Sequence, residues 1–458
     1  MKFAVVNLGC KVNRVESDAV AAALVSRGGE ASAPEEADLI VVNTCTVTAE
    51  ADKKARKAVR RALRGNARAA VFVSGCAAAL DPQAYRSMDP RVVVVGKAEL
   101  LSAVEKWAEE AEGGADAAAG GEAPQAADEE ASPAAQHVPS AASSPGPSAA
   151  TPAPSPAALA APLPVGEGFR TRVGVKVQDG CDNACSYCIV HTARGRSTSV
   201  PAQDVVEECV SLARAGVKEI VLTGINLGSY CDGDRRDPAS LRLVGLLERL
   251  LLATEDLHAE GEPPLRFRIS SIEPRDVGDD LIELLARADG RVCRHLHLPL
   301  QSGSDKVLRE MARPYDIEDF EGLVGRLRGR VPEISLSTDL IVGFPGETDE
   351  DFCATLDAAR ICAFSKLHVF QYSRRKGTPA AARQDQVPPE LKAARSRELR
   401  ALGDELRALD YARRVGTVEL ALVEDDGFAT TESYHEVPAP YGAPQGSLVG
   451  VLLAPKAL

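Results

Sequence analysis

The sequence predicts an α/β protein in three parts: an N-terminal open parallel α/β unit, a central partial (β/α)6 barrel and a small C-terminal β-barrel. Two observations predict this architecture. Apolar strand-like runs alternate with helical patterns in two blocks, which is typical of parallel sheets with covering helices. The chain then ends in short β-type runs after one long charged helix. Its 458 residues, 45% of them hydrophobic, are enough for several cores.

The first block, residues 1–108, supplies the N-terminal unit. Its elements are predicted as strands at 3–7, 39–43, 70–74 and 92–95, and as helices at 16–26, from 52 onward and at 99–111. Cys10, Cys45 and Cys76 each follow the end of a predicted strand. Because the carboxyl ends of parallel strands form the ligand crevice of an open sheet, we expect the three sulfurs at one rim.

Residues 109–167 separate the two blocks and differ from both. Thirty of these 59 residues are Ala or Pro, and the segment carries nine of the 13 net negative charges of the chain. Such a composition buries too little apolar surface to offset its ordering entropy. We predict a disordered linker, with a regulatory or partner-binding arm as the alternative.

The second block, residues 168–400, supplies the barrel. Its strands are predicted at 173–178, 219–223, 266–270, 295–300, 335–342 and 366–372, with helices between them such as 202–215, 241–253 and 349–359. Six units are too few for a closed eight-stranded barrel, so an open one is expected. A charged helix at 390–414 leads into β-type runs at 418–423 and 448–453, and residues 401–458 are assigned to the helix end and a small β-barrel.

The composition also bears on location. No window approaches 18 consecutive apolar residues, which predicts no membrane span, and the first eight residues lack the long apolar stretch of a signal peptide. We therefore expect a cytoplasmic protein. In that compartment, eleven cysteines indicate metal or catalytic sulfur rather than a disulfide framework.

Cys181, Cys185 and Cys188 form a C-x3-C-x2-C motif directly after the first barrel strand. Three thiolates in a compact loop suit three irons of a 4Fe–4S cluster and leave the fourth iron without a protein ligand. Zinc is the main alternative. Structural zinc sites are normally closed by four ligands at paired spacings, and a second matching pair is not found nearby in the sequence.

This motif, with Tyr187 before its last cysteine, resembles that of the radical S-adenosylmethionine (radical SAM) superfamily. The resemblance implies that S-adenosyl-L-methionine binds the open iron through its methionine moiety and is cleaved to a 5′-deoxyadenosyl radical. It further implies that Tyr187 lies beside the cofactor's adenine, with simple loop packing as the alternative.

The segments around Cys10, Cys45 and Cys76 resemble the N-terminal domain of methylthiotransferases within that superfamily. The resemblance implies that these cysteines hold a second 4Fe–4S cluster, which carries the sulfur to be inserted. The alternative is three unrelated buried cysteines. The other five cysteines show no such pattern and are interpreted as packing residues: Cys209, Cys231, Cys293, Cys353 and Cys362.

Further segments at 222–228, 297–304 and 339–348 resemble the superfamily's motifs near the cofactor. They imply cofactor contacts from Thr223, Gly224, Ser302, Asp339 and Gly343. No catalytic side chain beyond the two clusters is assigned. His295 and His297 are expected to face opposite sides of their strand as hydrogen-bonded structural residues. The C-terminal segment resembles a TRAM domain, a small β-barrel that helps hold RNA.

Three methylthiotransferase branches share this architecture. Residues 9–13, 43–48, 222–225 and 372–379 are most similar to the branch that adds a methylthio group to C2 of N6-threonylcarbamoyladenosine in tRNA. The alternatives are the branch specific for N6-isopentenyladenosine in tRNA and the one specific for a ribosomal-protein aspartate. A non-catalytic iron–sulfur RNA-binding protein is the alternative from another class.

Basic residues support an RNA partner, the tRNA anticodon stem-loop. A cationic helix follows Cys45, and two arginines follow the C-x3-C-x2-C motif. The predicted phosphate contacts are Lys53, Lys54, Arg56, Lys57, Arg60, Arg194 and Arg196. A solvated helix face is the alternative. The resemblance also implies a reducing partner such as a flavodoxin or ferredoxin, and we expect a monomer without a membrane partner.

Overall fold

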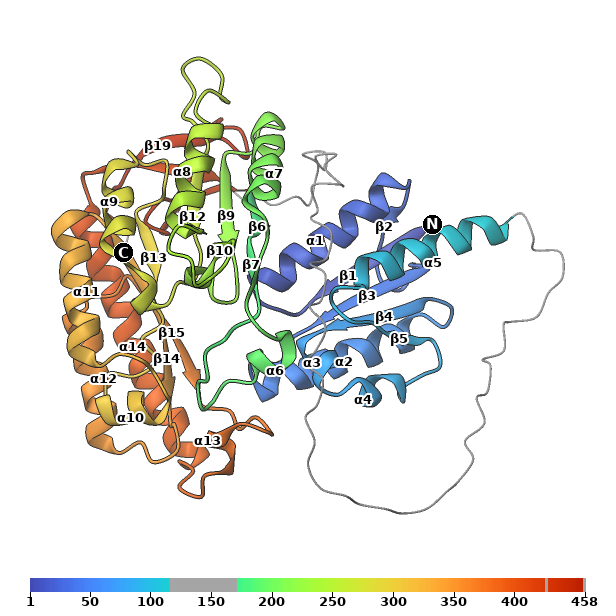
Figure 1. Ribbon diagram of the computed structural model, residues 1–458, viewed down its shortest axis with the longest axis horizontal. Coiled ribbons are helices and arrows are strands. Elements are labelled where there is room, and N and C mark those ends of the chain that lie inside the picture. Colours follow the sequence, from blue (N-terminus) through green and yellow to red (C-terminus); the bar gives the residue numbers. More distant parts are fainter. Residues whose placement is uncertain (116–170, 425–426, 456–458) are drawn as a thin grey trace.

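The computed structural model describes residues 1–115, 171–424 and 427–455. Figure 1 shows two α/β units side by side, with the C-terminal sheet against the second. Most of the predicted linker lies outside the described residues, but its first residues do not fit the prediction. They continue helix α5 (Leu100–Ala115), so the helix is longer than its sequence pattern indicated. Within the described residues, no helix is both long and apolar enough to cross a bilayer.

The N-terminal unit is a five-stranded parallel sheet in the order β2-β1-β3-β4-β5. Alternate residues of β3 explain its two covered faces: Leu39 and Val41 pack with helices α1 and α5, whereas Ile40 and Val42 pack with helix α2. The strands are β1 (Lys2–Asn7), β2 (Glu30–Ala31), β3 (Leu39–Thr44), β4 (Ala70–Gly75) and β5 (Val92–Val94). The remaining helices are α1 (Lys11–Ser26), α2 (Ala49–Gly65), α3 (Cys76–Leu80) and α4 (Pro82–Arg86).

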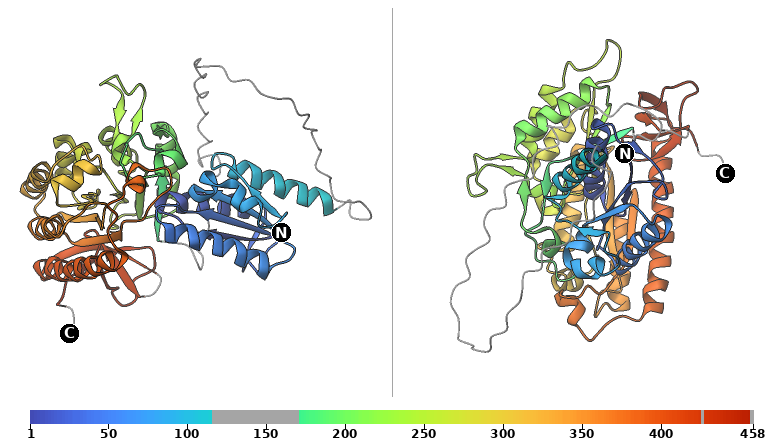
Figure 2. Two further views of the ribbon diagram at one scale, coloured as in Figure 1. Left: turned by 90° about the horizontal axis from the view of Figure 1, so that it is seen from below. Right: turned by 90° about the vertical axis from the view of Figure 1, so that its right-hand side faces the viewer.

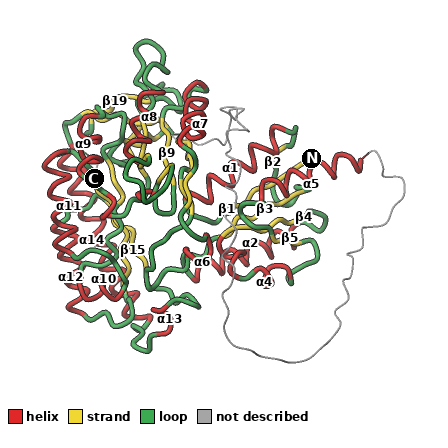
Figure 3. Tube along the Cα trace, in the orientation of Figure 1, coloured by secondary structure: helices red, strands yellow, loops and turns green. Residues whose placement is uncertain are grey.

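The second unit is the open six-stranded parallel barrel that the sequence predicts. Its strands are β6 (Arg172–Lys176), β9 (Glu219–Thr223), β12 (Arg266–Ile269), β13 (His295–His297), β14 (Ser335–Val342) and β15 (Lys366–Gln371). The two halves, β6-β9-β12 and β13-β14-β15, meet through single bridges at 267–292 and 271–297. Helices surround the strands (Figure 3).

Alternation along the strands separates an apolar outside from a polar inside. Leu222, Phe267, Leu296 and Leu336 face the helices and are fully or almost fully buried in the main core. The residues between them face the barrel interior and are mostly polar or charged. The covering helices include α7 (Ala202–Arg214), α8 (Leu243–Ala253), α9 (Asp279–Arg287), α11 (Ile317–Arg330) and α12 (Asp349–Ile361).

The open side of the barrel, next to β6, is covered by the N-terminal unit. Helix α1 packs on β6 so closely that a Cβ atom at Gly174 would lie 2.6 Å from Cγ2 of Val15. The left view of Figure 2 shows the same side-by-side arrangement, and in the right view the N-terminal unit lies in front of the barrel. The first turn of α1, which follows Cys10, is therefore brought to the barrel mouth.

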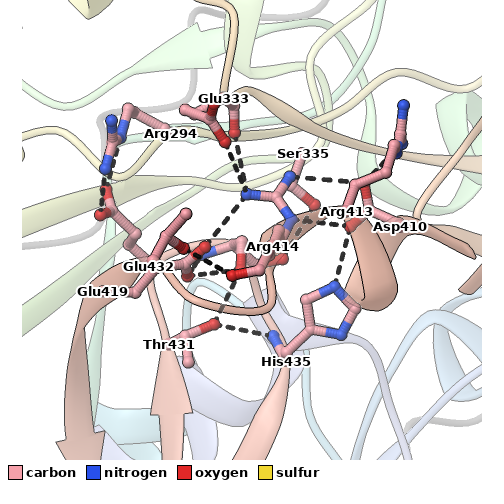
Figure 4. Close-up of polar contacts among 12 residues, drawn as sticks. Arg294, Glu333, Ser335, Asp410, Arg413, Arg414, Glu419, Thr431, Glu432 and His435 are labelled. Carbon is pink, nitrogen blue, oxygen red and sulfur yellow. Dashed lines mark hydrogen bonds and ion pairs between the residues drawn. The ribbon is translucent and has the colours of Figure 1, made fainter. Parts of the chain in front are cut away.

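Helix α14 (Pro389–Arg414) runs beside β15 and ends at the four-stranded antiparallel C-terminal sheet, in the order β18-β17-β16-β19. Its strands are β16 (Val418–Val423), β17 (Phe428–Thr431), β18 (Glu436–Pro438) and β19 (Leu448–Leu452). Figure 4 shows the polar network that docks this sheet. Asp410 accepts hydrogen bonds from His435 (2.8 Å) and Arg414 (2.9 Å). These hold the pKa of Asp410 well below its usual range although burial opposes them.

Candidate active site

Cys181, Cys185 and Cys188 lie together in the loop that follows the first barrel strand. Cys185 is buried, and the other two are partly exposed. Burial, followed by the neighbouring thiols, raises the pKa of Cys181, and the pKa of Cys188 is raised to about 11 for the same reasons. Backbone N–H groups of Asn183 and Val190 donate to the sulfurs of Cys181 and Cys188 at 3.4 Å. Three mutually close thiols with sulfur-directed donors suit a cluster that stabilises thiolates.

Arg313 is a functional candidate that the sequence did not reveal. Its guanidinium donates to Sγ of Cys185 at 3.3 Å and to Oη of Tyr315 at 2.9 Å, and it forms an ion pair with Glu273. It lies 128 residues beyond Cys185, so no local pattern connects the two. A buried cation fixed by two further partners would hold a negatively charged sulfur in place.

The second cysteine group comes from three strand ends of the N-terminal sheet. Cys10 precedes α1, Cys45 follows β3, and Cys76 begins α3. Burial raises the pKa of Cys45, and Cys10 and Cys76 raise it further. Lys97 donates to Sγ of Cys76 at 2.9 Å. The structure thus brings the three sulfurs to one sheet edge, as the strand pattern predicted.

Backbone and side-chain constraints fix this edge. Gly75, just before Cys76, has φ of 99°, and a Cβ there would lie 2.3 Å from the carbonyl oxygen of Thr44. Only glycine fits that position without rearrangement. The buried Asn13 accepts a hydrogen bond from Cys10 Sγ at 3.3 Å and donates to the side-chain oxygen of Asn43 at 2.7 Å. The amides therefore order the loop that carries the cysteines.

Arg194 joins the two cysteine groups, which corrects its predicted role as a phosphate contact. Its side chain is 1% exposed and pairs with Glu16 at 3.1 Å and Asp179 at 2.7 Å. A third bond, of 2.7 Å, reaches Oδ1 of Asn13. Both terminal nitrogens of its guanidinium are thus engaged between the barrel loop and α1. Arg196, by contrast, has a side chain that is 94% exposed and stays available to a ligand.

A second arginine also ties the units together. Arg375, after β15, contacts the hydroxyl of Thr46 and forms an ion pair of 2.6 Å with Asp52. Thr46 directly follows Cys45. The second group of thiols is therefore held against the barrel from two sides, through Arg194 and through Arg375.

The donor chemistry fits iron–sulfur clusters in both groups. Each offers three thiols together with donors directed at sulfur, as described above. Across residues 1–115, 171–424 and 427–455, no three His, Cys, Asp or Glu side chains converge on one metal ion. In a cluster each cysteine ligates a different iron, so its thiols need not converge in that way.

The predicted cofactor residues have different surroundings. Tyr187 packs against an apolar group that includes Phe344 and Tyr372, and burial raises its pKa well above the usual range. The Thr223 hydroxyl donates to the carbonyl of Val175 at 3.1 Å. Because the Thr223 hydroxyl is engaged within the protein, its backbone atoms remain for contact with a cofactor.

Three of the other four predicted cofactor residues are engaged within the protein, and one has an available side chain. Ser302 is fully buried, with its hydroxyl 3.3 Å from that of Thr355. The Gly343 N–H donates to Glu347, and Gly224 lies against the side chain of Gln178. Asp339 is partly exposed in the barrel interior, 3.3 Å from Nε2 of His297. Among these four residues, Asp339 is therefore the one whose polar side chain is available to a cofactor.

His295 and His297 lie on the same side of β13, so the expectation of opposite sides was wrong. Nε2 of His295 and Nδ1 of His297 lie 3.1 and 3.0 Å from the same hydroxyl, Oγ of Ser337. Residues two apart on a strand share a face. Both histidines therefore line the barrel interior, and both are hydrogen-bonded as predicted.

The cationic helix is α2, and it presents its basic residues to solvent. Ala55, Val59 and Ala62 face the sheet, whereas Lys53, Lys54, Lys57 and Arg60 are exposed. Arg56 is partly exposed and lies 3.6 Å from Asp81. The side chain of Thr48 caps the helix by accepting from the Ala51 N–H at 3.1 Å. A positive face thus begins a few residues after Cys45.

Comparisons with known proteins agree with this geometry. A model of the Radical SAM superfamily matches residues 175–359, and one described as Uncharacterized protein family UPF0004 matches residues 2–96. The chain is 36% identical to the threonylcarbamoyladenosine tRNA methylthiotransferase MtaB of Bacillus subtilis, covering 93% of this chain and 85% of that protein. It is 33% identical to the protein of that name from Thermotoga maritima, covering 89% and 82%.

Other similar proteins carry different names. The tRNA-2-methylthio-N(6)-dimethylallyladenosine synthase of Mycolicibacterium paratuberculosis is 35% identical, with 92% of this chain and 75% of that protein covered. Among solved structures, the radical S-adenosylmethionine methyltransferase TsrM from Kitasatospora setae matches with a TM-score of 0.52 at 19% identity, covering 83% of this chain and 77% of that chain. At this identity the likeness concerns the fold alone.

Proposed function

Since this chain belongs to the radical SAM tRNA methylthiotransferase family, we propose that it adds a methylthio group to C2 of N6-threonylcarbamoyladenosine beside the anticodon of tRNA. The observation that carries the proposal is the pair of three-cysteine groups joined through Arg194 and Asn13. The relatives with that substrate in their names include the ones at 36% and 33% identity described above.

The reaction explains why two such groups are needed. C2 of adenine is an unactivated aromatic carbon, and general acid–base catalysis has no acidic proton to remove there. When bound, a 4Fe–4S cluster with S-adenosyl-L-methionine supplies a carbon radical, and a second cluster supplies sulfur. We assign the first cluster to Cys181, Cys185 and Cys188, and the second to Cys10, Cys45 and Cys76.

The protein's own residues position these groups. Arg313 fixes Cys185, and Arg194 fixes the distance between the first loop and α1. Tyr187 and Gly224 flank the cofactor in this proposal, and Asp339 presents a carboxylate from the barrel interior. The close packing of α1 on β6 covers the open side of the barrel, which would limit the access of water to the site.

RNA is held outside the barrel in this proposal. The exposed face of α2 and Arg196 contact phosphates, and the target base is splayed into the site as in other single-stranded RNA recognition. A reducing protein such as a flavodoxin or ferredoxin would supply the electron to a cluster held by Cys181, Cys185 and Cys188, and the enzyme works as a monomer.

The test uses reconstituted, full-length enzyme with two anticodon stem-loops, one carrying threonylcarbamoyladenosine and one carrying isopentenyladenosine. Mass spectrometry of the digested nucleosides should show the methylthio group only in the first. Insertion only into the second would refute the substrate and favour the relatives named for dimethylallyladenosine. Absence of S-adenosyl-L-methionine cleavage under reduction would refute the reaction class.

A further inference from the structure

Cationic side chains gather around one aromatic ring toward the amino ends of the barrel strands. The ring belongs to Tyr434, which lies in the turn between β17 and β18 and has φ of 70°. The Tyr434 ring stacks on His295 with centroids 5.0 Å apart. We define the Tyr434 recess by this ring and the side chains around it: Lys11, Arg172, Arg268, His295 and Lys366.

Four cations from four different elements surround the one ring. The distances to its centroid are 6.0 Å from Nζ of Lys11 and 5.8 Å from Nζ of Lys366. They are 5.2 Å from the guanidinium carbon of Arg172 and 4.7 Å from that of Arg268. Burial alone would raise the pKa of Tyr434, but Lys11, Arg172 and Arg268 lower it below the usual value. The field in the recess is therefore positive.

Two of these four cations, both arginines, form ion pairs with carboxylates. Arg268 pairs with Glu219 at 2.7 Å, and Arg172 with Glu424 at 3.1 Å. Within the part of the chain that the structure describes, neither Lys11 nor Lys366 forms an ion pair with a carboxylate. Two ammonium groups without a carboxylate partner among the described residues thus lie over the same ring.

One member of this group adjoins the cysteines of the N-terminal unit. Lys11 directly follows Cys10 and is exposed, although it lies over the ring of Tyr434, which is 423 residues further along the chain. Lys366 and Tyr434 are partly exposed, whereas Arg268 and His295 beside them are buried. Lys11 and Lys366 are therefore the two cations of the group that are both accessible and without a carboxylate partner among the described residues.

We propose that the Tyr434 recess binds the carboxylate of the base's N6 substituent, so that Lys11 and Lys366 select an anionic substituent over an apolar one. This inference rests on the proposed function. A threonylcarbamoyl group ends in a carboxylate, which suits ammonium donors. An isopentenyl group is a hydrocarbon. In this recess it would displace the water that hydrogen-bonds to both ammonium groups, and it offers no acceptor in return. Such unpaired polar groups give strong discrimination.

The test compares stem-loops that differ only at the carboxylate. One carries threonylcarbamoyladenosine and the other its methyl ester, which has the same shape but no charge. Dissociation constants are measured by fluorescence anisotropy for wild-type holoenzyme, for Lys366→Met and Lys366→Arg, and for Lys106→Met as a matched loss of a lysine on the exposed face of α5. Equilibrium dialysis measures S-adenosyl-L-methionine binding in parallel.

Wild type and Lys106→Met should bind the acid about tenfold more tightly than the ester. Lys366→Met should bind both equally, with the ester affinity unchanged, and Lys366→Arg should restore part of the preference. Equal binding of acid and ester by wild type would overturn the subsite. Loss of S-adenosyl-L-methionine binding in Lys366→Met would also overturn it, because the cations would then serve the cofactor's carboxylate.

The two proposals fail in different ways. If methylthio insertion occurs in both the acid and the ester with equal efficiency, the function stands and the subsite is refuted. If neither is modified but the acid still binds more tightly, the subsite stands as an anion site and the proposed function is refuted.

Discussion

The guanidinium of Arg194 donates a 2.7 Å hydrogen bond to Oδ1 of Asn13 across the boundary between the barrel and the N-terminal unit. Asn13 accepts a bond from Cys10 through the same oxygen atom, at 3.3 Å. Arg194 follows the first cysteine loop by six residues. The contacts from Arg194 through Asn13 to Cys10 therefore set the separation between the two cysteine groups.

Replacing Arg194 with Met should uncouple the two halves of the reaction. Glu16 and Asp179 would lose a buried partner, a change that costs about 3–5 kcal/mol where a buried pair is broken. We expect S-adenosyl-L-methionine cleavage to continue while methylthio insertion falls at least tenfold. The ratio of 5′-deoxyadenosine to modified nucleoside measures this. Arg326→Met, which removes an exposed arginine of α11, should leave the ratio unchanged; an unchanged ratio in Arg194→Met would contradict the coupling.

Arg313 should tune the first cluster. Removal of a charged donor to Cys185 destabilises the more negative, reduced state. In Arg313→Met the reduction potential should fall by roughly tens of millivolts, with Arg313→Lys in between. Spectroelectrochemistry of the reconstituted protein gives the potential directly. A reduction potential equal to that of wild type would show that Arg313 only packs against the loop.

The two cysteine groups should separate in iron analysis. Substituting Ala for Cys10, Cys45 and Cys76 together should remove about half of the iron, one of two equal clusters, and eliminate methylthio insertion. Reductive cleavage of S-adenosyl-L-methionine should persist in that variant. Cys185→Ala should show the reverse pattern, with cleavage lost and the N-terminal iron kept. Full iron content in the triple variant would show that those three thiols only pack.

Charge on α2 should control tRNA affinity. The variant Lys53→Gln, Lys54→Gln and Lys57→Gln removes three exposed cations and should weaken binding of any tRNA similarly. The slope of log affinity against log salt should also become shallower by about 2–3. Filter binding between low and moderate salt measures both. Lys106→Met is the control, and an unchanged slope would place the phosphates elsewhere.

Acid should loosen the C-terminal sheet through Glu219. Burial alone would raise its pKa, but Arg268 and Arg266 lower it from 4.5 to about 2. The carboxylate therefore contributes stability that is complete above pH about 4.5 and is lost as pH falls toward 2. The contribution is on the order of 3 kcal/mol. Urea unfolding at several pH values should show this loss in wild type and a flatter profile in Glu219→Gln. The same dependence of unfolding free energy on pH in both proteins would show that Glu219 is not the group responsible.

Local patterns in the sequence predicted the elements and both cysteine groups. The strand at 335–342 was predicted with its observed bounds, because its apolar and polar residues alternate and its flanks contain turn residues. Cys10, Cys45 and Cys76 were placed at one edge by the topology of parallel strands alone.

The contacts between segments could not be predicted in this way. Arg194 was interpreted as a phosphate contact because it follows the C-x3-C-x2-C motif, yet its partner Glu16 is 178 residues away. Arg313 and Cys185 are separated by 128 residues. A charge in a sequence does not reveal whether a distant carboxylate will bury it. The wrong prediction for His295 and His297 did not involve a distant contact. Residues two apart on a strand share a face, so strand geometry alone places both histidines on one side of β13.

The position of Tyr434 has a consequence for the order in which the protein is made. The ammonium group of Lys11 and the ring of Tyr434 lie 6.0 Å apart, although the two residues are 423 positions apart in the sequence and Lys11 is synthesised first. Until residues 418–455 have been synthesised, Arg266 and Arg268 lack the carbonyl groups of Leu420, Thr430 and Glu432 that they bond in the finished protein. A nascent chain thus contains all six cysteines of the two groups before the C-terminal sheet can dock on the barrel. The contacts of Arg266 and Arg268 with that sheet therefore complete the barrel only after both cysteine groups have been synthesised.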